Sequence, residues 1–81
     1  MKLGDKKTML NSLLENVEVQ QEIVEQIDLF NRMLDLKKSN AMGEGVQSWT
    51  ISELESRINE YKDKLHGFEK IYKELLQMLV S

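Results

Sequence analysis

An unbroken heptad pattern in the C-terminal half of the chain constrains its fold more than any other feature. Steps of three and four residues from Ile51 meet an apolar or aromatic residue each time, as far as Leu79. The positions are Ile51, Leu54, Ile58, Tyr61, Leu65, Phe68, Tyr72, Leu75 and Leu79. A repeat of 3.5 residues kept over this length is typical of a helix that winds around a partner helix. The pattern predicts a helix over about 51–80 that packs on another helix.

The residues at the start of this helix predict its first turn. Thr50 is a suitable N-cap and Glu53 stands at the third helical position, so the two form a capping box. Trp49 and Leu54 flank the cap as a hydrophobic staple. Gly67 lies inside the predicted helix on its outer face. It is expected to cost about 1 kcal/mol relative to alanine.

The N-terminal half has a similar but less strict pattern, which predicts a helix over about 6–38. Its three-four steps meet Leu10, Leu13, Val17, Gln20, Val24, Ile27, Asn31 and Leu34. Two of these residues, Gln20 and Asn31, are polar, and a polar residue at a packing position usually fixes the register. Ile23 and Phe30 flank the row, so the apolar face is wide. A wide face suits a bundle of more than two helices.

A glycine-containing segment between the two halves predicts a reversal of the chain. Gly43 and Gly45 lie in the one stretch without helical periodicity, and the loop is expected over about 39–49. We predict an all-α fold, a single domain over 1–81 in the form of an antiparallel two-helix, coiled-coil-like hairpin. We expect this hairpin to assemble into a four-helix or larger bundle. The alternative is a helix-break-helix chain that pairs only with other chains.

Size and charge limit the classes of protein to which the chain can belong. A domain of 81 residues buries only about 60–65% of its unfolded surface, so partners are expected to add stability. The chain has no cysteine and its net charge is −3, which favours a cytoplasmic protein and disfavours a nucleic-acid partner. No apolar run approaches the length of a membrane span, and the N-terminus has no signal-peptide pattern. We therefore expect no membrane partner.

Apolar residues outside the predicted packing row indicate surfaces for further contacts. Five of them gather near the open end of the expected hairpin and predict self-association: Met9, Leu14, Ile71, Leu76 and Met78. Three others form a stripe for a partner protein: Leu29, Met33 and Leu36. Leaving so many apolar side chains in water is unfavourable, and exposed apolar patches usually mark interaction sites.

Acidic residues of the N-terminal half share one outer ridge of its helix. They are spaced by three and four residues: Glu15, Glu18, Glu22 and Glu25. The ridge is either a docking surface for a basic partner or a solvated face that maintains solubility. We favour the interpretation as a solvated face.

No group of residues in the sequence predicts catalysis or cofactor binding. Asp63 and His66 are three residues apart, but a bundle di-iron site needs two Glu-x-x-His units and two more carboxylates. Gly43-Glu44-Gly45 lacks the spacing and the lysine of a phosphate-binding loop. We therefore expect no catalytic residues, no metal ion and no cofactor, and we expect that the chain is not an enzyme.

Three hypotheses of function remain. The leading one is a small interaction protein that acts by helix packing as a homo-oligomer, in the role of adaptor, assembly chaperone or inhibitor. The second is a structural subunit of a larger particle, since Gly45-Val46-Gln47-Ser48-Trp49-Thr50 before an acidic helix resembles the head-to-tail connector proteins of tailed phages. The third is an oligomer that binds a small anionic ligand between protomers, through Arg57, Lys62 or Lys64 beside Tyr61.

Overall fold

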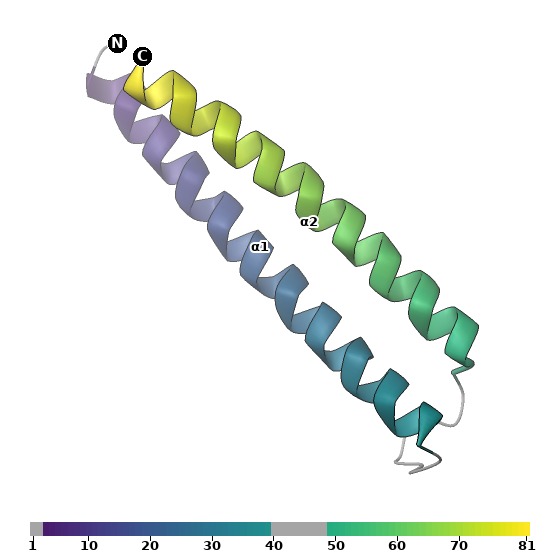
Figure 1. The fold of residues 1–81 in the computed structure, drawn as a ribbon. Coiled ribbons are helices and arrows are strands. Elements are labelled where there is room, and N and C mark those ends of the chain that lie inside the picture. Colours follow the sequence, from purple (N-terminus) through teal and green to yellow (C-terminus); the bar gives the residue numbers. More distant parts are fainter. Residues whose placement is uncertain (1–2, 40–48) are drawn as a thin grey trace.

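The protein is an antiparallel hairpin of two long α-helices (Figure 1). The computed structural model describes residues 3–39 and 49–81, so the centre of the predicted loop lies outside the described residues. Helix α1 spans Leu3–Lys38 and helix α2 spans Ile51–Val80. Within the described residues there are no strands, and α1 packs along α2. The predicted all-α helical hairpin is thus confirmed.

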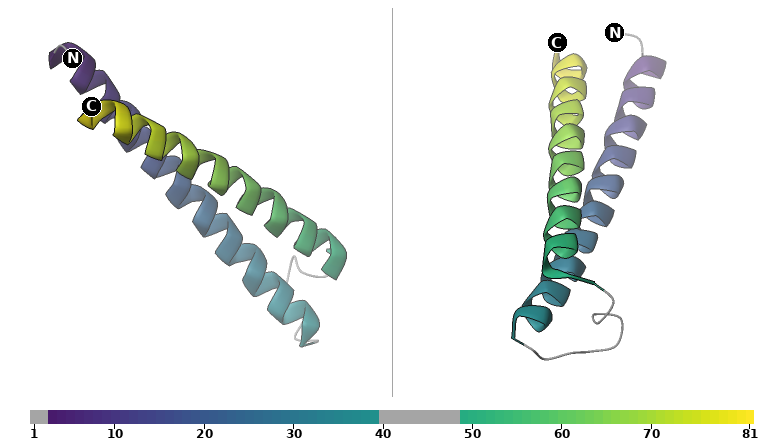
Figure 2. Two further views of the ribbon diagram at one scale, coloured as in Figure 1. Left: turned by 45° about the horizontal axis from the view of Figure 1, so that its top comes forward. Right: turned by 90° about the vertical axis from the view of Figure 1, so that its right-hand side faces the viewer.

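The hairpin is elongated and its helices are not in equally close contact along their length. Its extents are 57 × 18 × 15 Å. The right-hand view of Figure 2 shows that the helices cross near the connecting segment and draw apart toward the end that carries both termini. On α2 the two buried residues, Leu54 and Ile58, both lie in the half next to the connection. Tyr72 and Leu75, nearer the termini, are only half-buried.

The start of α2 has the predicted cap. Thr50 has extended backbone angles, and its hydroxyl accepts a hydrogen bond from the backbone N–H of Glu53 at 3.1 Å. The same hydroxyl donates to the Glu53 carboxylate at 3.2 Å, in place of the usual bond from that side chain to the backbone of the cap. Trp49 packs against the hydrophobic core just before the helix. The local sequence signals therefore fix where α2 begins.

The hydrophobic core lies near the connected end of the hairpin. Its buried residues are Ile23, Ile27, Leu34, Leu54 and Ile58. Beside this core, Phe30 contacts two other aromatic side chains. Its ring centroid lies 5.6 Å from that of Trp49 in an edge-to-face contact and 5.7 Å from that of Tyr61 in a stacked contact. Helix side chains lean toward the N-terminus of their own helix, so Phe30 and Tyr61 converge from opposite directions in an antiparallel pair.

The face that α1 turns toward α2 differs from the predicted one. Of the predicted packing residues, five are buried: Leu13, Ile27, Leu34, Leu54 and Ile58. Seven are half-buried: Gln20, Tyr61, Leu65, Phe68, Tyr72, Leu75 and Leu79. Four apolar ones are exposed: Leu10, Val17, Val24 and Ile51. The prediction was wrong for these four, and Asn31 is exposed as well.

A small rotation of α1 accounts for the difference. Asn16 and Ile23, each 7% exposed, replace Val17 and Val24 in the contact with α2. The side-chain amide of Asn16 donates a hydrogen bond to the carbonyl oxygen of Phe68 at 3.1 Å and accepts one from Gln20. A buried asparagine is tolerated when both ends of its amide are paired, so this position does not need an apolar residue.

The exposure of Ile51 has a separate cause. The heptad pattern placed Ile51 in the contact with the other helix, as the first position of its row. In the structure Trp49 packs on the core cluster, and Ile51 remains exposed in the first turn of α2. A large aromatic side chain just outside the helix thus covers the core in place of the first heptad position.

Candidate interaction surfaces

The residues predicted to mediate self-association lie at the open end of the hairpin, on two different flanks. Leu14 is 60% exposed and Met78 is 55% exposed, and Ile71 and Leu76 are also exposed. Met9 is half-buried. In an antiparallel pair, residues that follow a contact position lie on one flank and residues that precede one lie on the other.

This rule separates the four exposed residues into two pairs. Leu14 follows the contact residue Leu13, and Leu76 follows a half-buried residue of α2, so both lie on what we call the first flank. Ile71 and Met78 precede half-buried residues of α2, so they lie on the second flank. The structure therefore divides the single cluster that the sequence suggested.

A shallow groove runs along the second flank between the helices. It has a volume of about 260 Å³. Its lining is mainly apolar but includes carboxylate, hydroxyl and amide groups, and consists of Ser12, Glu15, Asn16, Val19, Phe68, Ile71 and Leu75. The groove is open to solvent and offers room for a side chain of a partner rather than for an enclosed small molecule.

The three residues predicted as a partner surface are not equivalent. Leu29 and Leu36 are exposed on α1. Met33 is half-buried and packs against the hydrophobic core of the hairpin. The apolar surface left to a partner here therefore consists of two leucines, with Arg32 and Asp35 beside Leu36.

An exposed apolar row along α1 was not identified from the sequence as a separate surface. We call it the α1 stripe, and its residues are Leu3, Leu10, Leu14, Val17 and Val24. Three of them belonged to the predicted contact with α2. The width of the apolar face was a visible signal, but the sequence could not show which side of that face α2 covers.

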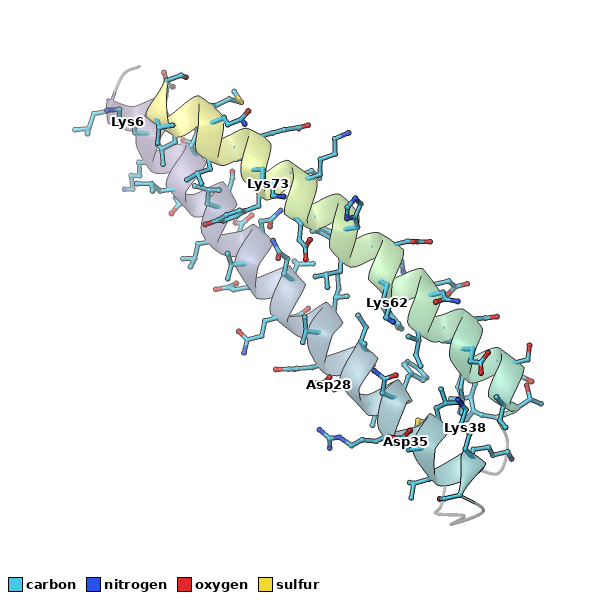
Figure 3. All side chains as sticks on the ribbon, viewed as in Figure 1. Lys6, Asp28, Asp35, Lys38, Lys62 and Lys73 are labelled. Atoms are coloured by element: carbon cyan, nitrogen blue, oxygen red, sulfur yellow. The ribbon has the colours of Figure 1, made fainter. Side chains whose placement is uncertain are left out.

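Charged residues are distributed unevenly along α1. The acidic ridge of Glu15, Glu18, Glu22 and Glu25 is exposed, and Asp28 continues the acidic segment. Figure 3 shows Lys6 near the N-terminal end of α1 and Asp28 well along the helix toward the connection. The central part of α1 is thus negative and its first turns carry adjacent lysines, Lys6 and Lys7.

The basic residues proposed for an anionic ligand have contacts within the chain. Arg57 forms an ion pair with Glu60 at 3.4 Å. The ammonium group of Lys64 lies 5.3 Å from the ring centroid of Tyr61, where a cation–π contact is favourable. Lys62 is exposed on the same helix. These contacts compete with an anion for Arg57 and Lys64.

The other chemical candidates give no assembled site in the part of the chain that the structure describes. His66 is exposed, and residues 3–39 and 49–81 contain no cluster of three or more carboxylate or imidazole side chains suited to a metal ion. As far as these residues go, neither helix combines the length and apolar character that crossing a membrane requires.

Fold and surfaces together define an all-α helical hairpin with uncovered apolar faces. Comparisons with protein-family models, curated proteins and solved structures give no match for this chain.

Proposed function

We propose that this chain is a non-enzymatic protein–protein interaction module that assembles with itself and acts by helix packing. One observation carries the proposal. Among the described residues, six apolar side chains are buried within the hairpin, whereas twelve large apolar side chains are exposed. A lone two-helix hairpin therefore leaves twice as many large apolar side chains exposed as it buries completely.

The free energy at stake is large for so small a protein. Complete burial of one large apolar side chain is worth roughly 1.5–3 kcal/mol. Covering four half-exposed side chains in each copy is then worth several kcal/mol, which is comparable with the roughly 4–12 kcal/mol of stability expected for 81 residues. Exposed patches of this extent usually mark interaction sites. Assembly into a four-helix bundle is the simplest way to cover them.

A second helical protein is the partner that we propose for the remaining surface. Leu29 and Leu36 are one pair of leucines on an exposed face of α1, two helical turns apart. The acidic ridge of α1 would favour a basic partner and disfavour nucleic acid. We further propose a cytoplasmic location, since a chain without cysteine needs no oxidising compartment.

The mass of the particle in solution tests the proposal. Light scattering on a size-exclusion column, over a wide range of concentration, is expected to give a multiple of 9.5 kDa. A monomer at every concentration would contradict self-assembly.

Matched variants then show which flank is covered. Leu14→Ser with Leu76→Ser removes apolar surface from the first flank, and Ile71→Ser with Met78→Ser removes it from the second. We expect at least one pair to lower the mass, whereas Asn59→Ser, at an exposed polar position of α2, leaves it unchanged. Unchanged mass in both pairs would mean that these residues do not hold the assembly together.

A further inference from the structure

The α1 stripe is part of a complete second heptad row. With Lys7 and Gln21 included, its positions are separated alternately by four and three residues: Leu3, Lys7, Leu10, Leu14, Val17, Gln21 and Val24. All seven side chains are exposed in the hairpin. The same spacing on the α2-facing side of α1 is what brings α2 into contact, so the second row has the pattern of a second helix contact.

The two rows lie at about a right angle to each other on α1. From Leu10 onward, each stripe residue comes one position after a buried or half-buried residue, as Leu14 follows Leu13 and Val24 follows Ile23. One residue corresponds to about 100° of rotation around an α-helix. A helix at the corner of a four-helix bundle has two neighbours in about this arrangement. In the hairpin, α2 occupies only one of these two places.

The order of residues in the stripe is self-complementary when reversed. The next two positions of the row are Asp28 and Asn31, so the apolar part ends at Val24. The midpoint of the stripe lies at Leu13–Leu14. In an antiparallel pair of α1 helices centred there, Leu14 meets its own counterpart and the other apolar residues meet apolar residues. The pairs are Leu3 with Val24 and Leu10 with Val17, while Lys7 meets Gln21. A two-fold interface requires such self-complementarity.

The charges of α1 favour the antiparallel arrangement over the parallel one. The acidic segment 15–28 contains five carboxylates and no basic residue. Reversal about Leu14 places Lys7, a member of the row, at the level of Gln21 in the middle of this segment of the other copy. A parallel pair would instead place Lys7 against Lys7 within the row, and like charges facing each other are unfavourable. Figure 3 shows how far Lys6 lies from Asp28 along one helix.

We propose that α1 pairs with α1 of a second copy, antiparallel and through the α1 stripe, about a two-fold axis near Leu14. This inference rests on the self-assembly proposed above and specifies its geometry. The first flank is then the dimer interface, with Leu76 at its border. The groove of the second flank, with Ile71 and Met78, remains outside that interface.

Disulfide cross-linking of single-cysteine variants tests this geometry, since the chain has no cysteine of its own. Under mild oxidation, Leu14→Cys is expected to form a covalent dimer, because the two-fold brings these residues together. An equimolar mixture of Leu10→Cys and Val17→Cys is expected to form the mixed dimer. Val24→Cys alone is expected to stay monomeric on a denaturing gel, because its counterpart lies about 30 Å away along the helix axis. Met78→Cys is the matched exposed control on the second flank.

The outcomes separate this inference from the proposed function. A covalent dimer of Val24→Cys would indicate a parallel pair and overturn the antiparallel geometry. Cross-linking of Met78→Cys but not of Leu14→Cys, in a protein whose mass shows an oligomer, would overturn the inference and leave self-assembly intact. A monomeric mass for the unmodified protein at every concentration would overturn both.

Discussion

Because α1 is rotated from the orientation predicted by the sequence, substitutions at the adjacent residues Ile23 and Val24 are expected to have very different effects on stability. Ile23 is 7% exposed and belongs to the core cluster, whereas Val24 is 43% exposed. The heptad pattern of the sequence had assigned the contact to Val24. Replacing each residue by alanine therefore tests whether the core of the hairpin is as the structure shows it.

The two expected effects differ severalfold. Ile23→Ala removes a buried side chain next to Ile27 and Ile58, and such a change lowers the free energy of unfolding by about 3 kcal/mol. For a domain of this size that corresponds to a fall in Tm of roughly 12–24 °C. Val24→Ala is expected to change stability by less than about 0.5 kcal/mol, because little burial is lost and alanine is the better helix former.

Thermal unfolding followed by far-UV circular dichroism measures both variants. The measurement belongs at a concentration where light scattering shows the hairpin alone, since a second copy on the α1 stripe would cover Val24. If Ile23→Ala does not fold, Ile23→Val provides a milder test, with an expected loss of about 0.5–1.5 kcal/mol. A loss for Val24→Ala as large as that for Ile23→Ala, in dilute protein, would refute the described orientation of α1.

Three further changes test other features of the hairpin. Gly67→Ala is expected to raise the free energy of unfolding by about 1 kcal/mol, because its new methyl group would meet no atom within 4 Å; a lower Tm would mean that another copy packs over this face. Thr50→Ala removes the acceptor of the Glu53 N–H and is expected to cost about 1 kcal/mol, whereas Thr50→Ser keeps the hydroxyl and most of the stability; equal Tm values for the two would contradict a role for the cap. Glu55→Gln breaks the ion pair with Lys38, whose charged atoms are 4.0 Å apart and whose two side chains are each more than half exposed. The change is expected to alter the free energy of unfolding in urea by less than about 0.5 kcal/mol. A larger loss would show that this contact holds the connected end together.

The beginning of α2 was predictable from the sequence because its determinants are local. Thr50, Glu53 and Trp49 lie within five residues, and the capping interaction depends on no distant contact. The hairpin itself followed from two helical patterns separated by glycines. These features need only spacing and residue type.

The orientation of α1 was not predictable in the same way. Positions 16–17 and 23–24 offer neighbouring candidates, and the apolar choice at the first pair, Val17, is the exposed one. In the structure Asn16 takes the contact position instead, and its amide donates to the carbonyl of Phe68, a residue 52 positions away. A sequence pattern treats asparagine as a poor core residue and contains no information about that carbonyl.

The same difficulty limits the prediction of interaction surfaces. The exposure of Leu14, Ile71, Leu76 and Met78 followed from their positions outside the heptad row, and the structure bears it out for each residue. Their division between two flanks depends on the rotation of α1, so it appeared only with the fold. Met33 is half-buried because the aromatic residues near the connection widen the core beyond a single row.

Because the buried core residues lie near the connected end, the two helices are expected to separate at different rates at the two ends of the hairpin. Backbone amides around Ile27 and Ile58 are expected to exchange their hydrogens slowly, since their exposure needs separation of the helices. Amides around Leu10 and Leu79 are held mainly by their own helices and are expected to exchange through fraying. A partner that binds the end with the termini would slow hydrogen exchange there and leave exchange in the core unchanged. The pattern of protected amides in a complex would therefore show where the partner is bound.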